Sequence, residues 1–311
     1  MNELSDFQIA LLKVFKQFAK YCEENSLIYY AAYGTLLGAI RHKGFIPWDD
    51  DIDVYMKRED YDKLIAKRNS LNGTPYKITY ILDGNGSPYP FAKFYTTEGT
   101  IWEYKHFPFI IGPWIDIFPI DEGDVEDKKA NTTYDRFHYL MWKYRKSIAD
   151  VKWRDIYHDL IHLNGFNGPI NLIKKVRYAP FKKKYLRDIA RCIDDIRQIK
   201  SSSLRIYPSG RSKEVYSKVL FKEAINVPFE DTHITIPNGY DEVLTAFFGD
   251  YMTLPPIECR VSQHDSFYIN LKENVSKEEI LKLMEGKINK KSKPLSLKTI
   301  IDEIKHRNKG F

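Results

Sequence analysis

The sequence predicts an α+β fold, with a mixed sheet flanked by helices and interrupted by a helical insertion. Two observations support this prediction. Before residue 123, short apolar runs that end at glycine or proline alternate with patterns of helical period, whereas from 124 to 206 strand signals almost disappear. With 311 residues, 43% of them apolar and 29% charged, the chain can bury one large core or two ordinary ones, and its composition excludes a disordered protein.

An N-terminal helix is predicted from a capping box at Ser5–Gln8, after which apolar residues recur at helical spacing as far as Glu24. The apolar and aromatic run 27–33 ends at Gly34, which predicts a buried strand and a turn. The same patterns predict further elements in this order: short segment 35–41, strand 52–55, helix 59–68, and strands 76–82, 91–95 and 114–118. We expect Pro119 to end the last of these strands.

The predicted insertion is rich in Tyr, Trp, Lys and Arg. After it, a strand is expected at 233–236, and Asn238 is expected to cap a helix, 240–248, that stops at Gly249. Lysine-rich helices close the chain. We therefore expect three parts, a core, the insertion and a C-terminal part that completes the core: 1–123, 124–206 and 207–311.

Membrane-spanning and secreted proteins are not expected from this sequence. The most apolar stretch, 107–120, is interrupted by Asp116, whereas spanning helices need about 18 or more apolar residues. The N-terminal residues lack the basic and apolar regions of a signal peptide. We therefore expect a cytoplasmic protein, whose three cysteines form no C-x-x-C pair and remain reduced thiols.

Four carboxylates, Asp49, Asp50, Asp51 and Asp53, lead directly into an apolar strand. If the strand includes them, alternation places Asp49, Asp51 and Asp53 on one face, where like charges repel. A divalent cation would neutralise them, and oxygen ligands suit Mg²⁺, Mn²⁺ or Ca²⁺. A calcium-binding EF-hand is excluded because its glycine position would be Val54. A solvated acidic loop is the alternative to a metal site.

Asp116 stands alone inside the apolar strand 114–118. Burying an unpaired charge is costly, so a partner is required. A neighbouring metal ion would supply one, and so would a salt bridge to a strand lysine such as Lys93. The sequence leaves both interpretations open.

Gly34-Thr35 stands where a strand is expected to meet a helix. Its backbone N–H groups and hydroxyl would lie at the positive end of the helix dipole, which favours phosphate. Arg41, between this turn and the acidic run, adds a cation. The sequence has no P-loop, dinucleotide-binding or zinc-protease motif. Groups that donate hydrogen bonds to phosphate and carboxylates that bind a metal ion are thus expected to meet at one bound nucleotide.

The segments Tyr33–Arg41 and Ile46–Val54, which read YGTLLGAIR and IPWDDDIDV, resemble the signature of the LicD family of phosphocholine transferases, to which fukutin-related proteins are also similar. The resemblance resumes near the C-terminus at these places: Pro237–Asp241, Phe248–Met252, Arg260 and His264. It covers roughly residues 10–122 and 228–265.

The resemblance implies a nucleotidyltransferase fold like that of DNA polymerase beta, in which an Asp-x-Asp strand and a third carboxylate hold two metal ions. Three residues match these carboxylates and are expected to be catalytic and metal-binding, with Mg²⁺ or Mn²⁺ as the cofactor: Asp51, Asp53 and Asp116. Four residues are expected to bind the donor: Gly34, Thr35, Arg41 and Trp48.

The activity implied by the resemblance is transfer of a phospho-alcohol, typically phosphocholine, from a CDP-linked donor such as CDP-choline. The acceptor would be a hydroxyl of a cell-surface glycan, such as lipopolysaccharide or teichoic acid, or of its lipid-linked precursor, and CMP would be released. Because a quaternary ammonium forms no conventional hydrogen bonds, choline would need aromatic faces. The candidates are Trp48, Tyr55, Tyr95 and Trp102.

Residues 174–191 carry eight basic side chains and one acidic side chain, a net charge of +7. Together with the preceding apolar residues Ile170, Leu172 and Ile173, this segment suits the anionic inner face of a membrane. A solvated helix face is the alternative. No recognisable nucleic-acid-binding module accompanies the charge, so we do not expect nucleic acid as a partner.

Two other functions remain open at this point. A nucleotidyltransferase would transfer NMP and release pyrophosphate instead of CMP. A non-catalytic polyanion-binding protein could use the same scaffold, but the intact set of carboxylates argues against it.

Overall fold

The computed structural model describes residues 4–151, 156–157, 167–206, 214–262 and 266–291. The chain divides into two compact units, Met1–Glu273 and Asn274–Phe311. The second unit contains helix α9 (Lys277–Lys291). The predicted boundaries at 123 and 206 both fall inside the first unit, which contains every element described below.

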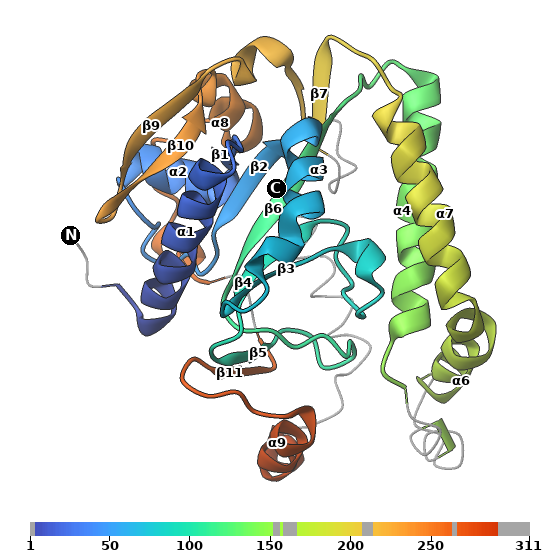
Figure 1. Cartoon of the computed structure of the whole chain (residues 1–311). Coiled ribbons are helices and arrows are strands. Elements are labelled where there is room, and N and C mark those ends of the chain that lie inside the picture. The colour runs from blue at the N-terminus through green and yellow to red at the C-terminus, as the bar shows by residue number, and fades with distance from the viewer. Residues whose placement is uncertain (1–3, 152–155, 158–166, 207–213, 263–265, 292–311) are drawn as a thin grey trace. The chain divides into compact units, whose positions relative to one another are not determined.

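Among the described residues, the first unit contains a mixed sheet of seven strands (Figure 1). Five of them follow the order β1-β2-β6-β4-β3, while β7 pairs with β6 and β8 pairs with β7. The strands are β1 Tyr30–Ala31, β2 Asp53–Lys57, β3 Tyr76–Thr79, β4 Ala92–Thr96, β6 Trp114–Glu122, β7 Ser203–Ile206 and β8 Val215–Ser217. Strands β2 and β6 are parallel and the other neighbours are antiparallel. The predicted α+β class with a mixed sheet is therefore confirmed.

Two smaller antiparallel pairs complete the strands, β5 (Thr100–Trp102) with β11 (Tyr268–Asn270) and β9 (Ala224–Phe229) with β10 (Thr232–Pro237). The helices of the first unit are α1 Asp6–Glu24, α2 Tyr33–Arg41, α3 Arg58–Lys67, α4 Lys128–Ile148, α6 Asn167–Ile173, α7 Lys182–Arg197 and α8 Tyr240–Phe248. None of the helices in the described part of the chain is long and apolar enough to cross a membrane.

Helix α1 begins where the sequence predicts, because Ser5 and Gln8 form the reciprocal capping box. Its apolar face packs on the sheet, where Phe18 meets Phe94 of β4 edge-on. Because Phe94 is paired with Ile115 of β6, the residues of β6 at 115 and 117 face α1. The side chain of Asp116 consequently points to the opposite face of the sheet.

Three local predictions were wrong. Strand β6 continues through Pro119, because β4 pairs with it only as far as Ile117 and β7 only from Ile120, so no antiparallel neighbour needs the missing N–H there. The N-cap of α8 is Gly239, while the Asn238 side chain instead accepts from the N–H of residue 223 and donates to the carbonyl of residue 219. Strand β1 has only two residues of the predicted 27–33.

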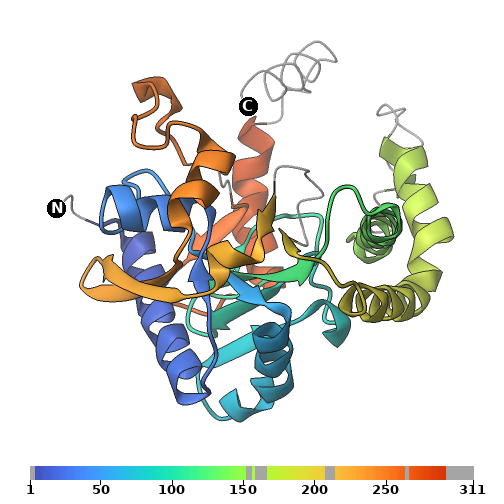
Figure 2. The same cartoon turned by 90° about the horizontal axis from the view of Figure 1, so that it is seen from above.

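The predicted insertion contains two long helices, α4 and α7, which lie side by side in both views (Figures 1 and 2). A π-helical turn at Lys174–Tyr178 and a 3-10 turn at Ala179–Phe181 connect α6 to α7. The segment also contributes β7 to the main sheet, which the sequence pattern did not predict. The helical segment is therefore joined to the core through a shared sheet.

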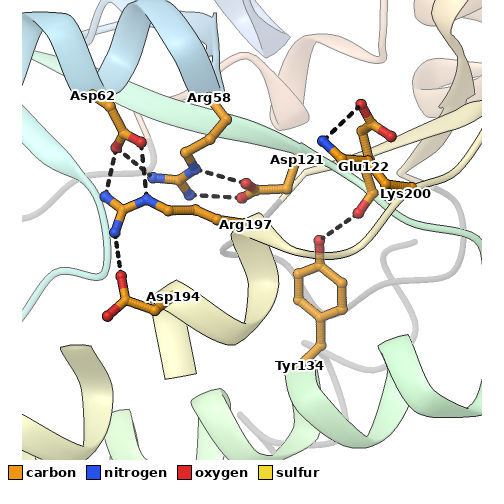
Figure 3. A network of polar contacts seen from close by, with 8 residues as sticks. All are labelled: Arg58, Asp62, Asp121, Glu122, Tyr134, Asp194, Arg197 and Lys200. Carbon is orange, nitrogen blue, oxygen red and sulfur yellow. Dashed lines mark hydrogen bonds and ion pairs between the residues drawn. The ribbon is translucent and has the colours of Figure 1, made fainter. Parts of the chain in front are cut away.

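A network of ion pairs attaches α7 to the sheet core (Figure 3). The guanidinium of Arg58 on α3 holds both carboxylate oxygens of Asp121 on β6, at 2.6 and 2.7 Å. Asp62 of α3 accepts from Arg197 of α7 at 2.8 and 2.9 Å, and Arg197 also bonds Asp194 at 2.6 Å. Since only 2% of the Asp121 side chain is exposed, its bidentate pair is the buried part of this network.

We expect Asp121→Ala to destabilise the first unit strongly, because it leaves the guanidinium of Arg58 buried without its main partner. Breaking one side of a buried pair costs about 3–5 kcal/mol. Asp194→Ala is the matched control: its carboxylate is 68% exposed, and exposed pairs contribute about 1 kcal/mol or less. Urea unfolding measures both values, and equal losses would show that burial does not set the strength of this network.

Candidate active site

Three charged residues form a row across the central strands. Asp53 of β2 lies directly opposite Asp116 of β6, and Asp116 lies directly opposite Lys93 of β4. Directly paired residues point to the same face of a sheet, so all three side chains share the face that is turned away from α1. Two carboxylates and an ammonium group are therefore neighbours at the centre of the sheet.

The carboxylates of the acidic run gather around Asp53, which is only 8% exposed. Burial raises the pKa of Asp53 well above its ordinary value, and the charges of Asp51, Asp116 and Asp49 raise it further. The structure thus brings together the three residues expected to be catalytic. It differs from the prediction in one respect: β2 begins at Asp53, so Asp49 and Asp51 precede the strand and are not placed by strand alternation.

Lys93 provides the salt bridge that was one of the two interpretations of Asp116. Its ammonium group lies 2.6 Å from Oδ1 of Asp116 and 3.9 Å from Oε2 of Glu103. Burial raises the pKa of Asp116 to about 6 although Lys93 acts to lower it. Glu103 also accepts a hydrogen bond from the hydroxyl of Tyr89. The sequence analysis did not identify Glu103 or Tyr89, since their positions in the chain carry no charge pattern or motif.

The expected phosphate cradle lies beside these carboxylates. A Cβ on Gly34 would stand 2.5 Å from Oδ2 of Asp49, so the glycine is required for this close approach. The hydroxyl oxygen of Thr35 accepts the backbone N–H of Asp53 at 2.9 Å. Thr35 lies within the first turn of α2, which begins at Tyr33 with Ala32 as its N-cap. Gly34 and Thr35 therefore tie the start of α2 to the start of β2.

Arg41 and Trp48, the other expected donor-binding residues, lie against the C-terminal motif. Arg41, the last residue of α2, donates to the carbonyl of Tyr251 at 2.7 Å. The guanidinium of Arg260 stands 5.6 Å from the ring centre of Trp48. Burial and the charge of Arg260 lower the pKa of Arg41, so two guanidinium groups are held near each other here. The segments that carry the family resemblance thus meet in space, except His264, which lies outside the described residues.

Two of the four aromatic candidates for a choline site belong to the core. Tyr55 is fully buried against Tyr33 and Phe118, and Trp102 is buried with its indole N–H bonded to a backbone carbonyl. Trp48 and Tyr95 keep partial exposure.

The expected divalent metal ion would be held by carboxylates. Asp51, Asp53 and Asp116 offer oxygen donors alone and repel one another, which suits a hard divalent cation. Across the part of the chain that the structure describes, however, no group of three or more His, Cys, Asp or Glu side chains is arranged to hold a metal ion. The donor set fits, but a preformed three-carboxylate cage is not present.

A mixed sheet that carries carboxylates on adjacent strands, beside a Gly-Thr helix start, is typical of a nucleotidyltransferase-type domain. Residues 26–153 match the family described as LicD/FKTN/FKRP, nucleotidyltransferase domain. The chain is 31% identical over 265 residues, 84% of its length, to the lipopolysaccharide cholinephosphotransferase LicD of Haemophilus influenzae, 96% of which is covered. It is also 40% identical over 72 residues, 23% of this chain and 27% of the relative, to the uncharacterized protein RP689 of Rickettsia prowazekii.

The chain belongs to the LicD family, as the resemblance predicted. It is an enzyme of the phosphotransferase class. Both expectations from the sequence are confirmed by these matches.

We expect Gly34→Val to weaken binding of CDP-choline, the donor expected from the resemblance, by about tenfold or more while the protein still folds, because the new side chain displaces the carboxylate of Asp49. Gly38→Ala is the contrasting variant: its Cβ would stand 2.4 Å from the backbone carbonyl of Gly44, which cannot move aside, so it should lower the melting temperature instead. Calorimetric titration and thermal melts separate the two effects. Normal donor binding by Gly34→Val would place the cradle elsewhere.

Proposed function

We propose that this enzyme transfers phosphocholine from CDP-choline to a hydroxyl of lipopolysaccharide or of its lipid-linked precursor, and releases CMP. One observation carries the proposal: Asp53 and Asp116 stand side by side on parallel strands in a chain that resembles a named lipopolysaccharide cholinephosphotransferase over most of its length. The donor, the acceptor and the metal are parts of this proposal.

The proposed step is a displacement at phosphorus. The acceptor hydroxyl oxygen forms a bond to the phosphorus of the phosphocholine group, the bond from that phosphorus to the bridging oxygen breaks, and CMP leaves with the electron pair. The proton of the hydroxyl passes to the carboxylate of Asp116, which Lys93 orients through its hydrogen bond to Oδ1. Asp51 and Asp53 would hold a divalent ion, Mg²⁺ or Mn²⁺, which neutralises charge on the phosphate oxygens when bound.

We assign recognition of the donor to residues around the row of Asp53, Asp116 and Lys93. The start of α2 lies against the acidic loop, because Gly34 approaches the carboxylate of Asp49. The positive end of the helix dipole there would favour a phosphate beside the metal. Trp48 is the aromatic candidate in that loop, and its ring already contacts a cation, Arg260.

The reaction type is tested by its products. Incubation with Mg²⁺, lipopolysaccharide and a panel of CDP-alcohols should yield CMP in an acceptor-dependent manner, with CDP-choline the preferred donor, as measured by mass spectrometry. Release of pyrophosphate from a nucleoside triphosphate would instead support the nucleotidyltransferase alternative, and no product with any donor would support the polyanion-binding one.

In this assay, Asp116→Asn tests the proposed catalytic base. It keeps the shape of the side chain but removes the base, so turnover should fall by about 10²-fold or more while donor binding changes much less. Asp50→Asn is the matched control, because Asp50 accepts a hydrogen bond from Ser262 and an asparagine oxygen can do the same. Equal losses in the two variants would show that the base is misassigned.

We further propose that the enzyme meets a lipid-linked acceptor at an anionic membrane surface. Apolar side chains of α6 and of its connection to α7 are exposed, and so are two aromatic side chains of α4: Ile170, Ile173, Val176 and Phe181, with Tyr139 and Trp142. The rings of Tyr139 and Trp142 stack and have lysines over them. This combination of exposed apolar, aromatic and basic side chains suits a lipid headgroup layer.

Binding to vesicles of phosphatidylcholine with phosphatidylglycerol tests this surface. Neutralising the exposed pair Lys183 and Lys184 should weaken binding by about 30-fold, at about 1 kcal/mol per basic residue. The exposed pair Lys43 and Lys222, outside this surface, serves as the control. Binding that is absent, or that is unchanged at about 0.5 M salt, where surface charges are screened within a few Å, would contradict the proposal.

A further inference from the structure

The ammonium group of Lys93 occupies a complete cation site inside the sheet. The side chain is only 1% exposed. Its nitrogen lies 2.6 Å from a carboxylate oxygen of Asp116 and 3.9 Å from one of Glu103. The ring centres of Tyr89 and Trp114 stand 4.1 and 4.2 Å away. Two carboxylates and two aromatic faces thus surround one positive charge.

A simple structural ion pair does not require this many groups. Lysine is seldom fully buried, and one carboxylate at hydrogen-bond distance would balance its charge. Here the second carboxylate, Glu103, is itself fixed by the hydroxyl of Tyr89. The site therefore holds a cation in one place, and that cation is the side chain of Lys93, a residue of β4.

The position of this charge relative to the acidic residues follows from the strand register. Asp116 lies between Asp53 on β2 and Lys93 on β4, so the ammonium approaches Asp116 from the side away from Asp53. A divalent ion bound between Asp116 and Glu103 would need the space that the ammonium fills. A divalent ion at Asp51 and Asp53 would not.

We propose that Lys93 supplies, at Asp116, the positive charge that a second metal ion supplies in two-metal phosphotransferases, so that this enzyme takes a single divalent ion at Asp51 and Asp53. This inference rests on the proposed function, which requires one divalent ion. It differs from the expectation of two ions that came from the family resemblance. Lys93 acts through Asp116 and is therefore a positioning residue.

The number of bound ions tests the inference without an activity assay. Mn²⁺ titration followed by electron paramagnetic resonance should give one ion per chain in the wild type, with the spectrum of an isolated ion. Asp51→Asn and Asp53→Asn should abolish this binding. In Lys93→Met, the carboxylates of Asp116 and Glu103 lose their cation, so a second Mn²⁺ should bind and the spectrum should show two magnetically coupled ions. Lys93→Arg keeps the charge and should bind one ion.

The outcomes separate this inference from the proposed function. Two ions in the wild type would overturn the role of Lys93 and leave metal-dependent transfer intact, whereas no bound ion would overturn both. One ion in the wild type and still one in a folded Lys93→Met protein would also overturn the inference. If Lys93→Met does not fold, the wild-type and Lys93→Arg counts decide: one ion in each supports the inference, and two in either contradicts it.

Discussion

The salt bridge between Asp116 and Lys93 allows two carboxylates to stand side by side inside the sheet. Adjacent strands are separated by about 4.8 Å, so Asp53 and Asp116 repel each other across β2 and β6. Burial is a second cost, because it disfavours the charged form of each carboxylate. The ammonium at 2.6 Å offsets part of both effects. The antiparallel register of β4 on β6 is what puts it there, and a shift by one residue would turn Lys93 to the opposite face.

The acidic loop depends on a second local constraint, at the start of α2. Thr35 accepts the backbone N–H of Asp53, so the first turn of the helix fixes where β2 begins. Gly34 leaves room for the carboxylate of Asp49 against the helix backbone. Each of these two segments therefore depends on the other for its geometry. Farther along, Asp50 and Arg41 hold the C-terminal segment through Ser262 and Tyr251.

Sequence patterns predicted the features that depend on neighbouring residues. The capping box of α1, the acidic run and the isolated Asp116 were all identified from short segments. The register of β4 on β6 was not, because it joins residues 23 positions apart and no local pattern encodes it. For this reason the sequence left the partner of Asp116 open between a metal ion and Lys93. The wrong prediction at Pro119 has the same origin, since whether a strand tolerates proline depends on which neighbour lies beside it.

Two ion pairs on β6 hold their carboxylates in different ways. Asp116 and Asp121 are an odd number of residues apart, so they point to opposite faces of the sheet. The planar guanidinium of Arg58 donates to both oxygens of Asp121, so both oxygens of that carboxylate hold α3 on the sheet. Lys93 is a point charge and bonds only Oδ1 of Asp116. A carboxylate held at one oxygen stays fixed in place and still has a second oxygen with which to take a proton. Under the proposed mechanism, lysine at 93 and arginine at 58 therefore distinguish the face of the strand that takes the proton from the face that holds α3.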